Sequence, residues 1–288
     1  MKPAKTPTET KAKPPGGLRK RLLLSFGALV SALIVVEIVL RVAGIPRSYA
    51  PHSDAVQFAF TNLGTPDNPF YVNYPGRITF RYDGNPRGYF GEENEIHHDV
   101  NPSGFRGPAV GPKAEGSFRI VFLGDSFTFG EGVRNEHTFA EETARQLRKQ
   151  RRPVEPCNLG VGGYNTSQSL FMLKQMGLGM KPDVVVVGYT LNDAEPPLFR
   201  IDPESGQSVR RDRESRIAAE ASASKPPEGF LYRFRIAQLV WHVTRQREMT
   251  AQTIEYYRSI NKPGEQGRIE SERALRQIIS ICRERDIP

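Results

Sequence analysis

A chain of 288 residues with 38% apolar and 25% charged residues is long enough to bury a sizeable core in one or two domains. Its formal net charge is +8, but residues 1–21 hold seven Lys or Arg and one Glu, so the other residues carry only +2. The body of the chain therefore lacks the basic excess that is typical of nucleic-acid binding, and we expect no nucleic-acid partner.

Cysteines and histidines are few and scattered along the chain. Cys157 and Cys282 are compatible with one disulfide or with two free thiols, but not with a disulfide framework. None of the five histidines stands at zinc-site spacing from a cysteine. The neighbours His97 and His98 are adjacent in sequence and so rarely share a ligand face. We therefore expect no metal and no cofactor.

The N-terminal segment combines a basic arm with an apolar stretch. Residues 1–21 predict a disordered arm, and residues 22–44 are long enough to span a bilayer, with Glu37 and Arg41 near the far end. Three interpretations are open: an uncleaved signal-anchor helix, a cleaved signal peptide, or a buried core helix. The long polar arm and the lack of an A-x-A cleavage site favour the anchor. Because a positive arm stays in the cytoplasm, we expect a single-pass protein of the bacterial inner membrane whose main domain is periplasmic or extracellular.

Residues 45–116 contain many Pro, Gly, Asn and aromatic residues and show no helical periodicity. They predict a collar of irregular and β structure, with short strands at 76–82 and at 89–90. The stretch N-P-S-G-F-R-G-P at 101–108 is rich in turn-forming residues and predicts a loop just before the main domain.

The main domain is predicted to span residues 117–288. Its first half alternates apolar strands with helices, at 118–123, 138–150, 154–159, 166–177 and 183–189. Thr138 and Glu141 form a capping-box pattern at the start of the first helix. The unbroken valines of the last strand are typical of a strand covered on both faces. This order predicts an α/β fold with a parallel sheet and right-handed crossovers.

The next two segments are predicted to lie outside the sheet. Residues 195–229 are polar and predict a surface excursion from the domain. Residues 230–246 form a strongly apolar amphipathic stretch. We expect this stretch to pack on the core, with the membrane surface as the alternative, because interfacial helices normally have a more one-sided apolar face.

The last segment predicts one more helix at 269–285. Its expected inward positions are Leu275, Ile278, Ile279 and Cys282. Residues 286–288 resemble the turn into another strand, so we expect the domain to be incomplete at its C-terminal end.

Three loops with reactive or hydrogen-bonding groups follow the three predicted strands. They carry Gly124-Asp125-Ser126, the run 158–163, and Asn192-Asp193. In a parallel sheet these loops meet at one edge, so a serine hydroxyl, a glycine N–H and a side-chain amide would converge there. This combination gives acyl transfer a nucleophile and donors for the oxyanion. Gly-Asp-Ser alone also fits a tight turn with a serine cap.

These motifs resemble the SGNH/GDSL hydrolase family over residues 101–193. Gly-Asp-Ser at 124–126 is similar to the family's first block, N-L-G-V-G-G-Y-N-T at 158–166 to the second, and G-Y-T-L-N-D at 188–193 to the third. The resemblance implies a flavodoxin-like three-layer α/β/α sandwich.

The resemblance also implies residue roles and a substrate class. Ser126 would attack an ester carbonyl, and the N–H groups of Ser126 and Gly163 together with the Asn192 amide would hold the oxyanion. Family substrates are esters, often acetyl groups on polysaccharides or acyl groups on lipids. The turn at 101–107 and the N-terminal anchor resemble a membrane-anchored, periplasm-facing branch. We therefore expect an ester-bearing glycan or lipid as substrate and the membrane as a partner of residues 22–44.

One block of the family's pattern does not occur. No Asp-x-x-His, which supplies the base and its orienting carboxylate, stands anywhere in the 288 residues. Neither His137 nor His242 is predicted as the base, and His242 is expected to be packed within its apolar stretch. We expect the missing block beyond Pro288. The alternative is a non-catalytic glycan- or lipid-binding relative on the same fold.

A nucleotide-binding loop is a third interpretation of the first motif. Gly124, Gly130 and Gly132 would then surround a phosphate. The loop lacks the Lys-Ser/Thr ending of a P-loop, and its spacing is not G-x-G-x-x-G. The sequence thus favours a membrane-anchored serine esterase.

Overall fold

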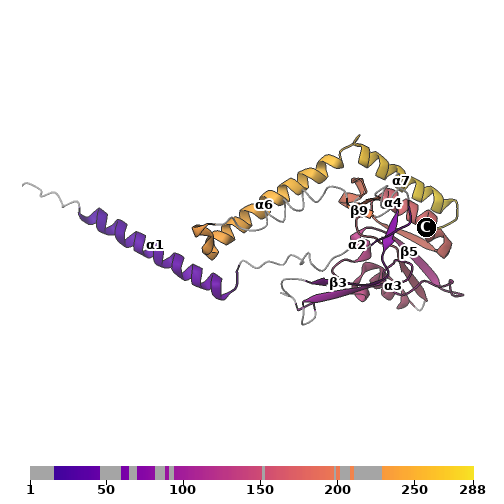
Figure 1. The fold of residues 1–288 in the computed structure, drawn as a ribbon, viewed down its shortest axis with the longest axis horizontal. Helices are drawn as coiled ribbons and strands as arrows, with labels where there is room; N and C mark the ends of the chain where they lie inside the picture. The colour runs from indigo at the N-terminus through magenta and orange to yellow at the C-terminus, as the bar shows by residue number, and fades with distance from the viewer. Residues whose placement is uncertain are drawn as a thin grey trace, which may run out of the picture. The chain divides into compact units, whose positions relative to one another are not determined.

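The computed structural model describes residues 16–45, 60–64, 70–81, 88–90, 94–150, 153–197, 199–201, 208–210 and 229–288. Most of the predicted arm at 1–21 and of the predicted excursion at 195–229 lies outside the described residues. The chain forms two compact units. One contains α1 and the start of α6, and the other contains the α/β domain with the collar that precedes it (Figure 1).

A parallel sheet of three strands forms the centre of the α/β unit. The strand order is β6-β5-β7, in which β5 is Phe118–Gly124, β6 is Val154–Asn158 and β7 is Val184–Gly188. Both neighbours run parallel to β5, which confirms the predicted sheet. The register pairs Phe122 with Asn158 and Gly124 with Gly188, so all three strands end at one edge.

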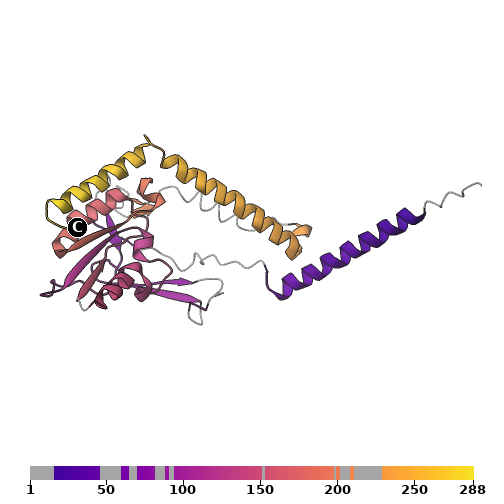
Figure 2. The same ribbon diagram turned by 180° about the vertical axis from the view of Figure 1, so that it is seen from behind.

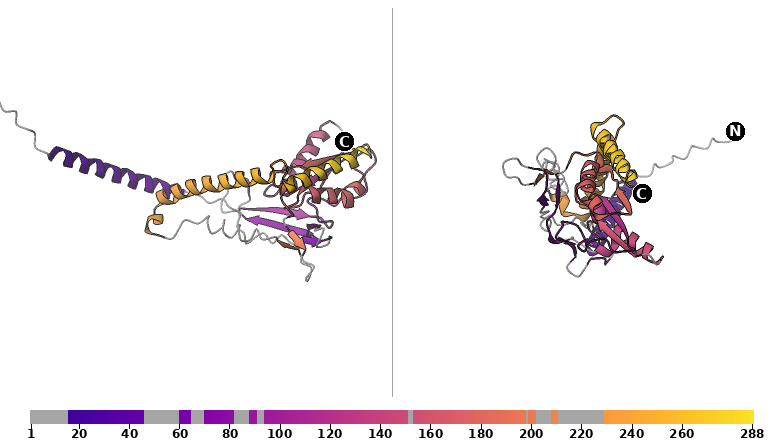
Figure 3. Two further views of the ribbon diagram at one scale, coloured as in Figure 1. Left: turned by 90° about the horizontal axis from the view of Figure 1, so that it is seen from above. Right: turned by 90° about the vertical axis from the view of Figure 1, so that its right-hand side faces the viewer.

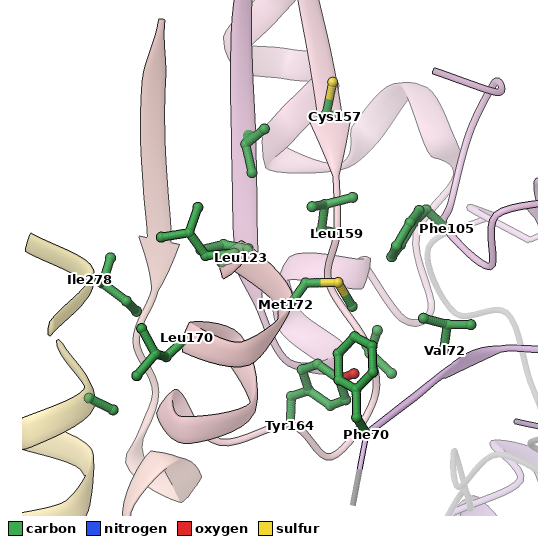
Figure 4. Close-up of a cluster of buried hydrophobic side chains, with 14 of the residues drawn as sticks. Phe70, Val72, Phe105, Leu123, Cys157, Leu159, Tyr164, Leu170, Met172 and Ile278 are labelled. Carbon is green, nitrogen blue, oxygen red and sulfur yellow. The ribbon is translucent and has the colours of Figure 1, made fainter. Parts of the chain in front are cut away.

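Helices cover both faces of this sheet. Alternate residues of β5 face opposite sides, because side chains alternate along a strand. Ile120 and Phe122 pack against Ala140 and Ala144 of α3 (Phe139–Arg148). The opposite face packs against two further helices, α4 (Thr166–Met172) and α7 (Gln266–Arg283), through the larger core cluster that Figure 4 shows. The reverse view in Figure 2 shows α7 running beside α4. The predicted three-layer α/β/α sandwich is therefore confirmed.

The caps of α3 and α4 agree with their sequences. The Thr138 hydroxyl accepts a hydrogen bond from the Glu141 N–H at 3.3 Å, as the capping pattern predicted. Asn165 and Gln168 form a reciprocal capping box at the start of α4. The helix then continues as a π-helical turn, Leu173–Gly177, and a 3₁₀ turn, Leu178–Met180.

The buried face of α7 differs from the predicted one. The buried residues are Ser271, Ala274, Ile278 and Cys282. The inward position predicted for Ile279 was wrong, because Ile279 is exposed, and Leu275 is only half-buried. Small side chains occupy most of the buried stripe, since α7 approaches its neighbours closely. A Cβ at Gly267, for example, would lie only 3.0 Å from the carbonyl carbon of Ala194.

The outer strand β7 is covered on both faces, as its valines predicted. Val185 and Val187 pack against one core cluster, and Val184 and Val186 pack against the other. Every residue of β7 is nevertheless only half-buried. On the side away from β5, the Val185 N–H donates to the carbonyl of Pro288 at 3.1 Å. The end of the described chain thus lies beside this strand.

The collar contains two antiparallel strand pairs. One joins β1 (Phe60–Asn62) to β2 (Tyr71–Asn73), and the other joins β3 (Gly76–Arg81) to β4 (Glu95–Val100). The left view of Figure 3 shows β3 and β4 as paired purple arrows. The predicted strand at 76–82 is thus confirmed. The one at 89–90 was wrong, and β4 was missed because its E-I-H-H-D-V sequence looks polar. A further pair, β8 (Phe199–Ile201) and β9 (Ser208–Arg210), lies in the predicted excursion.

The second unit consists of helices with almost no buried surface. Helix α1 (Gly16–Val42) is long and apolar enough to cross a membrane, and Leu40 is its one buried residue among those described. A buried core helix does not fit this exposure. A 3₁₀ turn (Phe230–Arg233) precedes α6 (Arg235–Ile260), in which no residue is buried. The expectation that residues 230–246 pack on the core was therefore wrong.

Candidate active site

Ser126 stands at the end of β5, where the chain turns into the short helix α2 (Ser126–Phe129). Asp125 caps this helix, and its Oδ1 accepts a hydrogen bond from the Phe127 N–H at 2.9 Å. The Ser126 side chain is half-buried, and its hydroxyl has no hydrogen-bond partner among the described residues. The turn thus presents a serine oxygen that is free to contact a ligand.

Glycines at the ends of all three strands surround Thr128 of α2. A Cβ added to Gly124 would lie 2.9 Å from the carbonyl oxygen of Gly188 and closer still to the Thr128 hydroxyl. A Cβ at Gly188 would meet the same hydroxyl, and one at Gly160 would lie 2.7 Å from the carbonyl carbon of Thr128. Side chains at these positions would push α2 off the sheet. The glycines of the three motifs therefore allow the serine helix to sit directly on the strand ends.

The loop after β6 holds the backbone of the serine helix. The Asn158 amide donates to the carbonyl of Thr128 at 2.7 Å, and its oxygen accepts from the Gly160 N–H at 3.0 Å. The Val161 N–H donates to the carbonyl of Gly124 at 3.1 Å. Gly163 follows two residues later with a φ of +77°, a conformation that favours glycine. Its N–H has no acceptor among the described residues.

The loop after β7 places an amide beside the serine turn. Asn192 lies on a 3₁₀ turn, Leu191–Ala194, and its Nδ2 donates to Asp125 Oδ2 at 3.0 Å. The Thr190 hydroxyl lies 3.0 Å from the same oxygen and also contacts the Asn192 Oδ1. Asp125, which directly precedes Ser126, therefore holds the Asn192 amide beside the serine turn. One of the two amide hydrogens of Asn192 remains available for a ligand.

A buried carboxylate holds this amide loop against the helices. Asp193 accepts hydrogen bonds from the Thr190 N–H and the Thr166 hydroxyl, both at 2.6 Å. The Thr166 hydroxyl lies 2.8 Å from the hydroxyl of Ser271 on α7. Burial raises the pKa of Asp193, and the hydrogen bonds from both threonines oppose that rise.

Two buried residues of the collar brace the loop that follows Ser126, and sequence analysis identified neither. The Arg106 guanidinium donates to the carbonyl of Phe129 at 3.0 Å and contacts the carbonyls of Gly130 and Val133. His98 Nε2 accepts a hydrogen bond from the Gly132 N–H at 3.0 Å. Burial, and next the nearby Arg106 charge, lower the pKa of His98 to about 4, so the ring is neutral near pH 7.

An open cleft of about 580 Å³ lies over the serine. Its lining combines Ser126 with apolar and polar side chains: Phe127, Gly130, Glu131, Val133, His137, Thr138 and Phe139. His137 Nδ1 lies 2.7 Å from the Tyr89 hydroxyl. His242 lies on α6, where it is half-buried and its ring centroid lies 5.0 Å from that of Trp241. Of these two histidines, the structure brings His137 to the serine cleft.

The remaining titratable groups form no further site among the described residues. No group of three His, Cys, Asp or Glu side chains is arranged to hold a metal within them. Histidines 97 and 98 alternate across β4, with His97 exposed and His98 buried. Cys157 and Cys282 are both free and buried, which leaves the two-thiol interpretation. Burial raises the pKa of the Cys157 thiol to about 11.

Comparisons with known proteins agree with the motifs. Residues 122–288 match the model of the GDSL-like lipase/acylhydrolase family. Two solved structures are similar to the chain: the SGNH-hydrolase family esterase AlinE4 at 26% identity and TesA at 20% identity. AlinE4 aligns over 28% of this chain and 44% of its own with a TM-score of 0.26, and TesA over 26% and 42% with a TM-score of 0.25. The chain thus spans less than half the length of these two proteins. No curated protein matches the chain.

The family match covers more than half of the chain and contains Ser126, Gly163 and Asn192. It begins within β5, just before the serine turn, and continues through α7. The chain therefore belongs to the GDSL-like lipase/acylhydrolase family.

Proposed function

We propose that this protein is an ester hydrolase that uses Ser126 as its nucleophile. The observation that carries the proposal is the junction of three strand ends. There the Ser126 hydroxyl, which has no hydrogen-bond partner in the described part of the chain, opens into a cleft, and Asp125 accepts a hydrogen bond from the Asn192 amide beside the same turn. Family membership supports ester chemistry at this junction.

The proposed reaction proceeds in two steps. The Ser126 oxygen bonds to the ester carbonyl carbon, and the tetrahedral intermediate collapses as the C–O bond to the leaving group breaks. The proton that the serine loses ends on the leaving oxygen, which departs as the alcohol. Water then attacks the acyl-serine and releases the acid. The N–H groups of Ser126 and Gly163 and the Asn192 amide stabilise the negative oxygen in both steps. The proposal assigns no base, because Asp-x-x-His does not occur in the 288 residues.

The proposed location follows from α1 and its charges. Helix α1 is a candidate span, and the seven Lys or Arg in residues 1–21 precede or begin it. A positive flank on the cytoplasmic side would place the α/β unit on the outer side of the inner membrane. The proposed substrates are therefore O-acyl or O-acetyl esters of polysaccharides or lipids on that side.

The first test is covalent labelling of the folded full chain with a fluorophosphonate, together with hydrolysis of p-nitrophenyl acetate. We expect labelling at Ser126, and we expect Ser126→Ala to lose both the labelling and the turnover above the uncatalysed background. Ser103→Ala is the matched control, since Ser103 is an exposed serine of the collar loop. Equal turnover by the wild type and Ser126→Ala would overturn the proposal. So would glycan or lipid binding without any turnover, which is the outcome expected of a non-catalytic relative.

The oxyanion donors require a separate test. Asn192→Ala removes one donor and should lower kcat by about a hundredfold or more with little change in KM, because the donor acts mainly on the developing charge. An unchanged kcat would remove Asn192 from the proposed oxyanion site.

A further inference from the structure

The segment Phe230–Val243 exposes a run of large apolar side chains. The exposed ones are Phe230, Leu231, Phe234, Val240 and Val243. Leu231 keeps 68% of its surface exposed, and no residue of α6 is buried among those described. Leaving such a side chain in water rather than burying it costs about 1.5–3 kcal/mol. The described part of the chain does not bury these side chains, so we expect another apolar surface to bury them.

Helix α1 supplies the cap for this segment. The Glu37 carboxylate accepts hydrogen bonds from the N–H groups of Arg235 and Ile236, at 2.9 and 3.1 Å. Arg41 donates to the carbonyl of Arg233 at 2.9 Å and to Glu37 at 2.7 Å. The Glu37 side chain is only 12% exposed. The only acid of α1 is thus used to bind the start of α6.

The position of Glu37 along α1 sets the depth of the segment. Glu37 stands five residues before the last residue of α1, Val42, which is about 7–8 Å along the helix axis. With 27 residues, α1 is about 40 Å long, which exceeds the roughly 30 Å hydrocarbon core of a bilayer. The basic residues at the start of α1 end at Arg21, so the hydrocarbon core would begin near Leu22, and about 20 residues would reach its outer boundary near Arg41. Glu37 and the first turn of α6 beside it would then lie at the boundary between the acyl chains and the headgroup layer.

The composition of the segment suits that boundary. Tyr232, Trp241 and the two phenylalanines have rings of the kind that gather at membrane interfaces. Arg233 and Arg235 add positive charge, which anionic lipid headgroups attract. Apolar rings and arginines in one short stretch are typical of segments that lie in the membrane surface.

We propose that Phe230–Val243 is a membrane-docking segment that lies at the boundary between the acyl chains and the headgroup layer of an anionic bilayer, next to the outer end of α1. The proposal rests on the membrane insertion of α1 that forms part of the proposed function. It gives the protein a second, surface-lying attachment besides the spanning helix.

Trp241 provides the test, because it is the only tryptophan of the chain. The full chain is reconstituted into phosphatidylglycerol vesicles that contain lipids brominated near the headgroup end or near the centre of the acyl chains. Flotation of the vesicles reports insertion of α1 independently of Trp241. We expect the shallow bromines to quench Trp241 fluorescence about threefold more strongly than the deep ones, as for a helix in the interface.

Two double variants sharpen this measurement. Leu231→Ser with Phe234→Ser should lower the shallow quenching about threefold while flotation stays unchanged. The matched control is Ile269→Ser with Ile279→Ser, which removes two exposed apolar residues of α7 and should leave the quenching unchanged. Quenching should also be weaker in phosphatidylcholine vesicles, since their headgroups have no net negative charge.

Three outcomes would overturn the proposal, and they differ in what else they affect. If the chain floats but Trp241 is not quenched by lipid, docking fails while the anchor stands. If the chain does not float with the vesicles, both the membrane insertion of α1 and the docking of the segment are refuted. The esterase assay remains an independent test of the proposed reaction. If Trp241 is shielded from acrylamide but not quenched by lipid, and crosslinking yields dimers, a second copy covers the segment instead.

Discussion

Val121 and Leu123 of β5 are completely buried, whereas the large apolar residues from Leu22 to Val39 of α1 keep 38% to 70% of their surface exposed. Both segments are rich in large apolar side chains, so their surroundings cause the difference. Helices of the same chain cover β5 on both faces. Helix α1 is apolar on all sides, the pattern of a helix whose solvent is lipid. Apolar content alone therefore does not distinguish a strand of the protein core from a candidate membrane-spanning helix.

The two units also differ in how they satisfy polar groups. In the α/β unit, Arg106, Asn158 and Asp193 bind backbone or side-chain groups from distant parts of the chain, and they hold the serine loop and the amide loop in place. In the other unit, Glu37 and Arg41 bind each other and the start of α6 and no further group of the described residues. We therefore expect substitutions in the α/β unit to cost far more stability than comparable ones in α1.

Glycine replacement should give the largest difference between the units. Gly160→Ala places a Cβ against the backbone of Thr128 and Phe129, so we expect a loss of more than about 4 kcal/mol of unfolding free energy, or no folded protein. Gly27→Ala in α1 meets nothing within 4 Å and should cause no measurable loss. Thermal unfolding of the full chain in detergent, followed by near-ultraviolet circular dichroism, compares the two. Equal melting temperatures would contradict the close packing of α2 on the strand ends.

Arginine replacement should give the next largest effect. Arg106→Ala leaves three loop carbonyls without their buried donor and opens a cavity, so we expect a loss of about 3–4 kcal/mol. Arg77→Ala in β3 breaks only the exposed pair with Asp99 and should cost less than about 1 kcal/mol. Urea unfolding measures both variants. A loss in Arg77→Ala as large as that in Arg106→Ala would remove the bracing role of Arg106.

Acid should weaken the α/β unit through His98. Its pKa is lowered from 6.5 to about 4 in the folded state, so the unfolded chain binds a proton first as the pH falls. The stability from the neutral ring is present above pH 6.5 and is lost between pH 6.5 and about 4, by about 3 kcal/mol in total. Urea unfolding across this range should show the loss in the wild type and a smaller one in His98→Gln. Parallel pH profiles of the two proteins would contradict a buried neutral His98.

Removal of a helix cap should give the smallest change in unfolding free energy, and it compares one cap from each unit. Thr138→Ala removes the cap of α3 and should cost the α/β unit about 1 kcal/mol. Glu37→Ala removes the acceptor that caps α6 from α1 and should leave the unfolding of the α/β unit unchanged. Near-ultraviolet circular dichroism during unfolding measures the first effect. A shift of the same size in Glu37→Ala would show that the two units unfold together.

Much of the fold and of the candidate site could be predicted because its signals are local. The strands β5, β6 and β7 are short apolar runs that end in Gly or Asn, and Ser126, Gly163 and Asn192 stand in the loops that follow them. Strand β4 was missed because its inward residues include His98, which looks polar until its partner Gly132 is known. Arg106 was missed for the same reason, since its carbonyl partners lie more than twenty residues further along the chain.

The sequence by itself determined the order of strands and helices, the family motifs and the presence of a long apolar N-terminal helix, because these depend on neighbouring residues and on periodicity. Only the tertiary structure decided which face of α7 is buried, that glycines from three strand ends enclose Thr128, and that Glu37 caps α6. Such contacts depend on how closely two distant backbones approach. That distance follows from the packing of the whole unit and is not encoded in any single stretch.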